Sequence, residues 1–356
     1  MRDASMIKHS GVMFIAVFLL FAFGGLCLAA APEPKVVIKM ASIAPKGSNL
    51  ANYFDELGRQ IREKTNNEVG FKMYWGGVQG DEKDVLRKIK LGQLHGGGFM
   101  GPGLGLIVSE VRITEIPYMF RNFQEVGYVR GKLQPYMDKK FEEKGFKVLG
   151  WMDLGFLHTF SKEPLVSLEV ARKQKWWTLE GEPIGQAMFQ ALNISPVSLS
   201  ISDVATSLST NMIDCATTTP YGAVAFQWHS RFKYMAGYPT GSILGATIIS
   251  KSVWDKISPA SQKIMMDVAE KEHDKLFKLT RQDNEKALAL LKKAGIIIVP
   301  FDPKNKDMQF VFETSRKVRE SLVGKLYKRD LLDSTLGYID EYRRTHPNDK
   351  TVLQAE

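Results

Sequence analysis

One uninterrupted helical pattern, over residues 258–294, most constrains how this chain can fold. Pro259 is the only proline in it, Ser258 precedes that proline as a helix N-cap, and the next glycine is Gly295. Apolar residues recur near helical spacing, among them Ile264, Val268, Leu276, Leu279, Leu288 and Leu291. A single helix of this length would measure roughly 55 Å, so it should contact two domains or bend. The alternative is two helices that break near Asp274.

The rest of the chain alternates between strand and helix patterns. The first set is strand 36–42, helix 50–64, strand 70–75 and helix 81–94. The second set is strand 175–179, helix 183–191, strand 196–199, helix 202–210 and strand 212–218. Such alternation is typical of βαβ units and predicts an α/β fold with a largely parallel sheet. Residues 145–161 join the two sets and could form a strand that crosses between two domains.

The N-terminus carries a long apolar run, residues 11–31, behind Arg2 and Lys8. A positive start, an apolar core and small residues at its end predict a secretory signal peptide over residues 1–31, cleaved near Ala29, Ala30 and Ala31. An uncleaved membrane anchor is the alternative, since about 20 apolar residues can span a bilayer.

The chain has two cysteines, Cys27 and Cys215. A lipoprotein reading of Cys27 is disfavoured by the bulky Leu26 before it. Cleavage of the signal would leave Cys215 alone, so no intramolecular disulfide is expected despite export. Because Cys215 lies in an apolar strand pattern, we interpret it as a buried, unreactive thiol.

Composition and motifs exclude several functions. The 356 residues suit two domains, and the formal net charge of +9 comes from basic residues spread among acids, so no nucleic-acid partner is expected. No histidine has metal-ligand spacing, no nucleophile motif occurs, and we predict no metal, cofactor or catalytic residue.

Residues 96–101 match G-x-G-x-x-G by coincidence, and these glycines should let the backbone approach a ligand or a neighbouring strand. An exported α/β protein of this kind is most simply a solute-binding protein.

Three segments resemble a known family. Residues 40–48 (MASIAPKGS), 76–97 (GGVQGDEKDVLRKIKLGQLHGG) and 191–214 (ALNISPVSLSISDVATSLSTNMID) are similar to the solute-binding subunits of TRAP (tripartite ATP-independent periplasmic) transporters. The resemblance implies a two-lobe α/β periplasmic binding protein with mixed sheets, crossing strands and a long helix that spans both lobes. It places lobe I at 35–153 plus 237–275, lobe II at 154–236 plus 276–345, and a tail at 346–356.

The chain departs from this family where the ligand is gripped. Members typically bind organic acids through a bidentate Arg, helped by an Asn and a second Arg. Here Trp177 stands at the first Arg, Thr218 at the Asn and Leu157 at the second Arg. An unpaired carboxylate is costly to bury, so the resemblance implies a more hydrophobic or less anionic solute, in a chain of the subgroup that lacks this Arg.

The remaining candidate cleft residues are apolar or aromatic, namely Trp75, Phe99, Met100, Phe156 and Tyr221. Packing in the core is the alternative for these side chains, above all for Trp75 and Phe156. Lys46 or Arg112 could still supply a positive charge, whereas Glu180 and Glu182 would repel an anion or attract a cation.

The predicted function is that of a non-enzymatic periplasmic receptor that delivers a small-molecule solute to TRAP permease membrane subunits. The alternative is a carrier of hydrophobic cargo that works with a tetratricopeptide-repeat protein. A third class, an exported enzyme, would need a polar catalytic pair in the cleft, where the aligned positions offer Trp, Leu and Thr.

Overall fold

The computed structural model describes residues 33–300, 302 and 304–349, so the predicted signal peptide 1–31 and residues 350–356 of the predicted tail lie outside it. The strands are β1 Val36–Ala41, β2 Val69–Tyr74, β3 Gly96–Met100, β4 Phe146–Ser161, β5 Trp177–Leu179, β6 Val197–Leu199, β7 Cys215–Thr218, β8 Tyr234–Ala236, β9 Gly241–Ser250 and β10 Ile297–Val299. The α-helices are α1 Asn49–Lys64, α2 Glu82–Lys90, α3 Gly101–Gly105, α4 Phe123–Glu143, α5 Leu168–Lys173, α6 Pro183–Ala191, α7 Val204–Ser209, α8 Pro220–Ala225, α9 Lys251–Trp254, α10 Pro259–Lys293, α11 Lys306–Ser321 and α12 Arg329–Thr345. Short 3₁₀ helices occupy Ser109–Glu115, Ile201–Asp203 and Trp228–Arg231.

The strands form a mixed sheet in the order β10-β8-β4-β9-β3-β1-β2, with β7 also paired to β4, and a separate β5-β6 pair. Parallel pairing joins β1 to β2 and β3, β10 to β8, and β5 to β6. Antiparallel pairing joins β9 to β3 and β4, and it also joins β4 to β7 and β8. The βαβ pattern thus gives local parallel pairs, whereas the sheet as a whole is mixed because β9 returns between β3 and β4.

Strand β4 is the crossing strand that residues 145–161 predicted. From Phe146 to Leu157 it pairs with β9, and from His158 to Ser161 it pairs with β7. One strand therefore belongs to both ends of the sheet.

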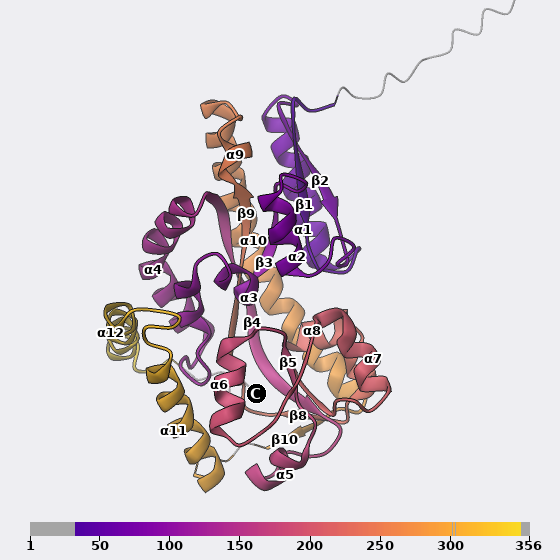
Figure 1. Cartoon of the computed structure of the whole chain (residues 1–356), viewed down its shortest axis with the longest axis vertical. Helices are drawn as coiled ribbons and strands as arrows, with labels where there is room; N and C mark the ends of the chain where they lie inside the picture. The colour runs from indigo at the N-terminus through magenta and orange to yellow at the C-terminus, as the bar shows by residue number, and fades with distance from the viewer. Residues whose placement is uncertain (1–32, 301, 303, 350–356) are drawn as a thin grey trace, which may run out of the picture. The chain divides into compact units, whose positions relative to one another are not determined.

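Helix α10 is a single helix of 35 residues, or roughly 50 Å, so the predicted continuous helix is confirmed and the alternative of a break near Asp274 is wrong. The Ser258 hydroxyl caps it by accepting a hydrogen bond from the Ser261 backbone N–H. The helix contacts α1, β4 and α8, as Figure 1 shows. Met265 packs in the cluster that contains Ile38, whereas Leu291 packs in the cluster that contains Phe160. One helix thus serves two cores at opposite ends of the sheet.

The predicted lobe limits remain a prediction. Two of them fall inside a strand or helix, and one falls directly after a strand. The limit at 153/154 lies inside β4, that at 236/237 directly after β8, and that at 275/276 inside α10. No helix of the described residues is both long enough and apolar enough to span a membrane.

The glycine-rich residues 96–98 begin β3, which lies between β1 and β9. A Cβ on Gly96 would lie 2.3 Å from the Ile248 carbonyl oxygen, and one on Gly97 would lie 2.3 Å from the Ala41 carbonyl oxygen. Of the two roles foreseen for these glycines, the close approach of a neighbouring strand is confirmed.

Candidate functional site

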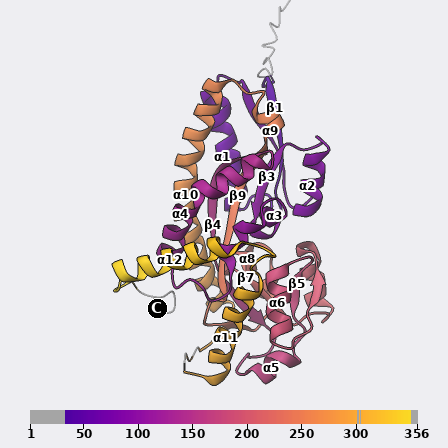
Figure 2. The ribbon, with the colours of Figure 1, turned by 60° about the vertical axis from the view of Figure 1, so that its left-hand side comes forward.

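A mostly apolar cavity of about 520 Å³ lies among β4, β5, α6, β9 and α11, within the ~300–1,000 Å³ range of small-molecule sites. Figures 1 and 2 show α6 and α11 side by side, and the two helices are in contact. The apolar wall contains Pro117, Tyr118, Leu165, Val166, Leu168, Trp176, Ile184, Met188, Phe189, Leu192, Ile194, Tyr238, Val299, Met308 and Val311. Such a wall suits a solute with a substantial hydrocarbon part.

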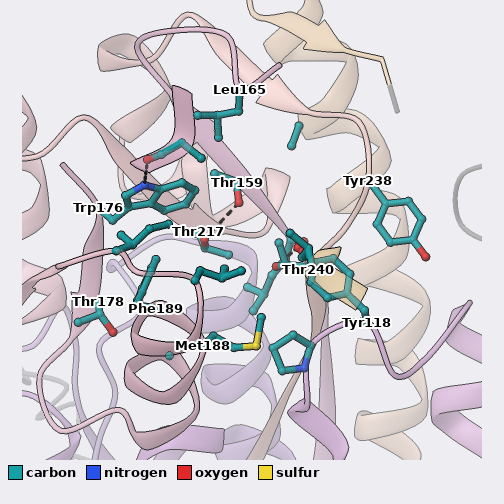
Figure 3. Close-up of a pocket in the computed structure, with 18 of the residues that line it drawn as sticks. Tyr118, Thr159, Leu165, Trp176, Thr178, Met188, Phe189, Thr217, Tyr238 and Thr240 are labelled. Atoms are coloured by element: carbon teal, nitrogen blue, oxygen red, sulfur yellow. Dashed lines mark hydrogen bonds between the residues drawn. The ribbon is translucent and has the colours of Figure 1, made fainter. Parts of the chain in front are cut away.

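Helix α6 supplies one stripe of this wall. Ile184 and Met188 on α6 and Leu192 directly after it recur every four residues, and all three line the cavity. Trp176 closes the same side, with its indole N–H donating to the Ala171 carbonyl at 2.7 Å. In Figure 3, Trp176 and Phe189 lie on one side of the cavity, with Tyr118 and Tyr238 on the other. The sequence shows this i, i+4, i+8 spacing, but a core helix would show it equally.

Some of the uncharged polar groups that line the cavity are already paired within the protein. The hydroxyls of Thr159 and Thr217 lie 3.4 Å apart on the paired strands β4 and β7 (Figure 3). The Ser242 hydroxyl donates to the Thr114 carbonyl at 3.0 Å. The hydrogen-bonding capacity of these three hydroxyls toward a ligand is therefore reduced.

One end of the cavity carries an ion triad, which we define as Arg112, Glu115 and Glu182, and the carboxylates of Asp302 and Asp307 also belong to the cavity lining. Arg112 Nε donates to Glu115 Oε2 at 2.6 Å, and its two terminal nitrogens lie 2.8 Å from the two carboxylate oxygens of Glu182. The three side chains are 5–12% exposed, so solvent screens them little. Glu115 is a site residue that the sequence analysis missed, and the Arg112–Glu182 pair joins positions 70 residues apart.

Burial and the neighbouring charges shift the pKa values of Arg112 and Glu115 in opposite directions. Burial raises the pKa of Glu115, although Arg112 and the Leu244 backbone N–H oppose that rise. For Arg112, burial lowers the pKa, but the two carboxylates outweigh it and the net shift is upward. The guanidinium therefore stays charged and is already neutralised by its own neighbours.

Three of the predicted site residues line the cavity, namely Trp177, Leu157 and Met100. The Trp177 indole N–H donates to the Leu199 carbonyl at 3.1 Å, and its ring meets Trp228 edge-on, with centroids 5.5 Å apart. The structure thus brings together the two positions at which the TRAP resemblance implies arginine.

The other predicted site residues lie outside this cavity lining. Phe99 and Phe156 are 1% and 3% exposed in the main core. Trp75 packs against the ring of Phe54. Thr218 pairs with His158 in the β4–β7 ladder, and the Tyr221 hydroxyl accepts a hydrogen bond from the Asn49 backbone N–H at 3.2 Å.

The two cations that could replace the family's arginines differ in position. Lys46 is exposed and does not line the cavity, whereas Arg112 does. Among the described lining residues, Arg112 is the only lysine, arginine or histidine.

Cys215 is fully buried, as predicted, and burial raises its thiol pKa. In the part of the chain that the structure describes, no group of three or more potential ligands could hold a metal ion.

Glu82 is a further buried carboxylate, which accepts hydrogen bonds from the backbone N–H groups of Met100 and Gly103 at 2.6 and 2.9 Å. Burial raises its pKa to about 8, whereas an unfolded Glu titrates near about 4.3. Between about pH 4.3 and pH 8, Glu82 is therefore protonated in the folded state but ionised in the unfolded state. The free energy of unfolding falls as the pH rises through this range. Relative to Glu82→Gln, we expect wild-type stability to fall by about 1 kcal/mol per pH unit from pH 5 to 8, measured by urea unfolding.

The matched control for this pH dependence is the exposed Glu180. Glu180→Gln should leave the slope of stability against pH as it is in the wild type. If plots of the free energy of unfolding against pH were parallel for wild type and Glu82→Gln, Glu82 would be ionised in the folded protein.

Comparisons with known proteins agree on one family. Residues 40–334 match the model of the bacterial extracellular solute-binding proteins, family 7 (DctP). The C4-dicarboxylate-binding periplasmic protein DctP of Rhodobacter capsulatus is 26% identical over 280 residues, which are 76% of this chain and 81% of that protein. The sialic acid-binding periplasmic protein SiaP of Vibrio cholerae is 22% identical over 309 residues, which are 85% of this chain and 95% of that protein.

The fold is also shared with solved structures. A TRAP periplasmic solute-binding protein from Pseudomonas putida F1, with bound D-glucuronate, superposes with a TM-score of 0.76 at 23% identity, covering 84% of this chain and 96% of that one. This likeness shows the two-lobe α/β periplasmic binding protein fold with its mixed sheet and long helix. The chain belongs to family 7 of the bacterial extracellular solute-binding proteins, the DctP family of TRAP solute receptors.

Proposed function

We propose that this receptor captures a solute more hydrophobic and less anionic than an organic acid and delivers it to a TRAP permease. The observation that supports this is the cavity itself. Its wall is mostly apolar, Trp177 and Leu157 stand where the resemblance places arginines, and the cavity's cation, Arg112, is held by two carboxylates. A carboxylate entering it would be buried without a free positive partner, which costs several kcal/mol.

The proposed setting is the periplasm, reached through an export signal over residues 1–31 that is cleaved near Ala29, Ala30 and Ala31. Coupling to an ion gradient would belong to the permease, and this chain would catalyse no reaction. No observation favours the alternative of a cargo carrier with a tetratricopeptide-repeat partner.

The test combines recovered ligand with direct binding. Mass spectrometry of the protein purified under native conditions should find a co-purified molecule that is largely apolar. Calorimetry with succinate and D-glucuronate should show no binding in the micromolar range. Low-micromolar binding of either acid would contradict the proposal.

Trp177→Arg tests the proposed role of this position. Restoring a cation at the cavity wall should lower the dissociation constant for D-glucuronate by at least tenfold, because the carboxylate gains a charge-assisted bidentate partner. Trp177→Leu is the control, since it removes the ring without adding charge and should gain no acid binding. Thermal melting is measured alongside, because unfolding of both variants would show that Trp177 is a core residue.

A further inference from the structure

The ion triad carries more negative than positive charge. Two carboxylates, Glu115 and Glu182, share the single guanidinium of Arg112 at 2.6–2.8 Å. Among the described residues that line the cavity, no second cation faces them. With both carboxylates ionised, the triad has a formal charge of −1 in a buried place.

The two carboxylate oxygens of Glu182 differ in their hydrogen bonds. Glu182 Oε1 accepts hydrogen bonds from Arg112 Nη2 at 2.8 Å and from the Ile184 backbone N–H at 3.0 Å. Glu182 Oε2 is buried and lies 2.8 Å from Arg112 Nη1, but it accepts no hydrogen bond from the described residues. Glu182 Oε2 thus has an ion-pair contact but no well-aligned donor, and a further N–H donor that reached it would add a hydrogen bond.

We infer that the solute is a hydrophobic amine, whose ammonium group binds the carboxylates of Glu182 and Glu115 and whose hydrocarbon part lies between the side of the cavity formed by Trp176 and Phe189 and the side formed by Tyr118 and Tyr238. This inference rests on the proposed function, because it takes the cavity as the solute site. The ammonium supplies the charge that the triad lacks and a donor for Glu182 Oε2. A carboxylate in the same place would add a third negative charge to the one guanidinium.

The choice of an amine over an alcohol follows from desolvation. An ammonium loses much of its hydration on entering a closed apolar cavity, and only an opposing charge offsets that loss. The triad offers that charge within a site where solvent screening is weak. An alcohol could donate to the same oxygen but would leave the negative charge uncompensated.

The experiment uses three probes with one hydrocarbon chain and different head groups, namely hexylamine, hexan-1-ol and hexanoate. Calorimetry with the mature protein at pH 7 should give a dissociation constant for hexylamine at least tenfold below that for hexan-1-ol, with hexanoate weakest. Glu182→Gln should weaken hexylamine binding at least tenfold and change hexan-1-ol binding by less than threefold. Glu180→Gln, an exposed neighbour outside the cavity lining, is the matched control and should change neither.

The outcomes separate this inference from the proposed function. Equal affinities for hexylamine and hexan-1-ol would overturn the amine but leave an apolar solute in place. Tightest binding of hexanoate, or no binding of any probe, would overturn both. If Glu182→Gln does not fold, Glu115→Gln is measured instead, and undiminished amine binding by that variant would overturn the inference.

Discussion

Replacing Arg112 with methionine should lower the free energy of unfolding by about 3–5 kcal/mol, because it leaves two buried carboxylates without their cation. Arg112 and Glu115 are almost completely buried, and Glu182 is only 12% exposed. Methionine keeps much of the apolar volume of the side chain, so the loss is mainly electrostatic. Urea unfolding followed by circular dichroism measures the effect, and an unchanged m-value would show that the two end states are comparable.

Two further variants separate charge from packing in this result. The triple variant Arg112→Met with Glu115→Gln and Glu182→Gln removes all three charges and should recover at least half of the lost stability. Arg59→Met removes a guanidinium that pairs with Glu56 and Glu63 on the surface of α1, and its effect should be far smaller. A loss for Arg112→Met as small as that for Arg59→Met would show that the triad is well solvated.

The fold could be predicted from local patterns because its elements have clear ends. The helix N-cap Ser258 and Pro259 placed the start of α10, and the pattern over 183–191 gave the bounds of α6. The continuity of α10 through Asp274 was not decided by sequence, since helical spacing alone does not distinguish one long helix from two. The antiparallel place of β9 between β3 and β4 also lacked a local signal, because strand order is set by packing of distant segments.

The cavity was predictable only in part. The positions of Trp177 and Leu157 came from the family resemblance, and both side chains line the cavity. Phe99 and Phe156 have the same apolar character but are buried in the core, since composition does not tell a cleft residue from a core residue. The pairing of Arg112 with Glu182 was unpredictable from spacing, because it joins a 3₁₀ helix to a residue 70 positions later.

Gly97→Ala should be among the most destabilising single-methyl additions in this protein. The new Cβ would lie 2.3 Å from the Ala41 carbonyl oxygen, on the strand that pairs with Gly97. Because the obstacle is backbone in a sheet, no rotamer change relieves it, and β1 and β3 must separate. We expect a loss of about 3 kcal/mol or more, the upper end for overpacked sites, measured by urea unfolding.

The control for Gly97→Ala is Gly131→Ala on α4, where no atom beyond the neighbouring residues and backbone of the same helix lies within 4 Å of the added Cβ. The free energy of unfolding of that variant should rise by about 0.5–1 kcal/mol, since alanine loses less backbone entropy than glycine when a helix folds. Opposite signs for the same chemical change would show that residue 97 is glycine because β1 approaches β3 closely. A neutral Gly97→Ala would instead mean that the sheet can open at β3, and the G-x-G-x-x-G match would then need another explanation.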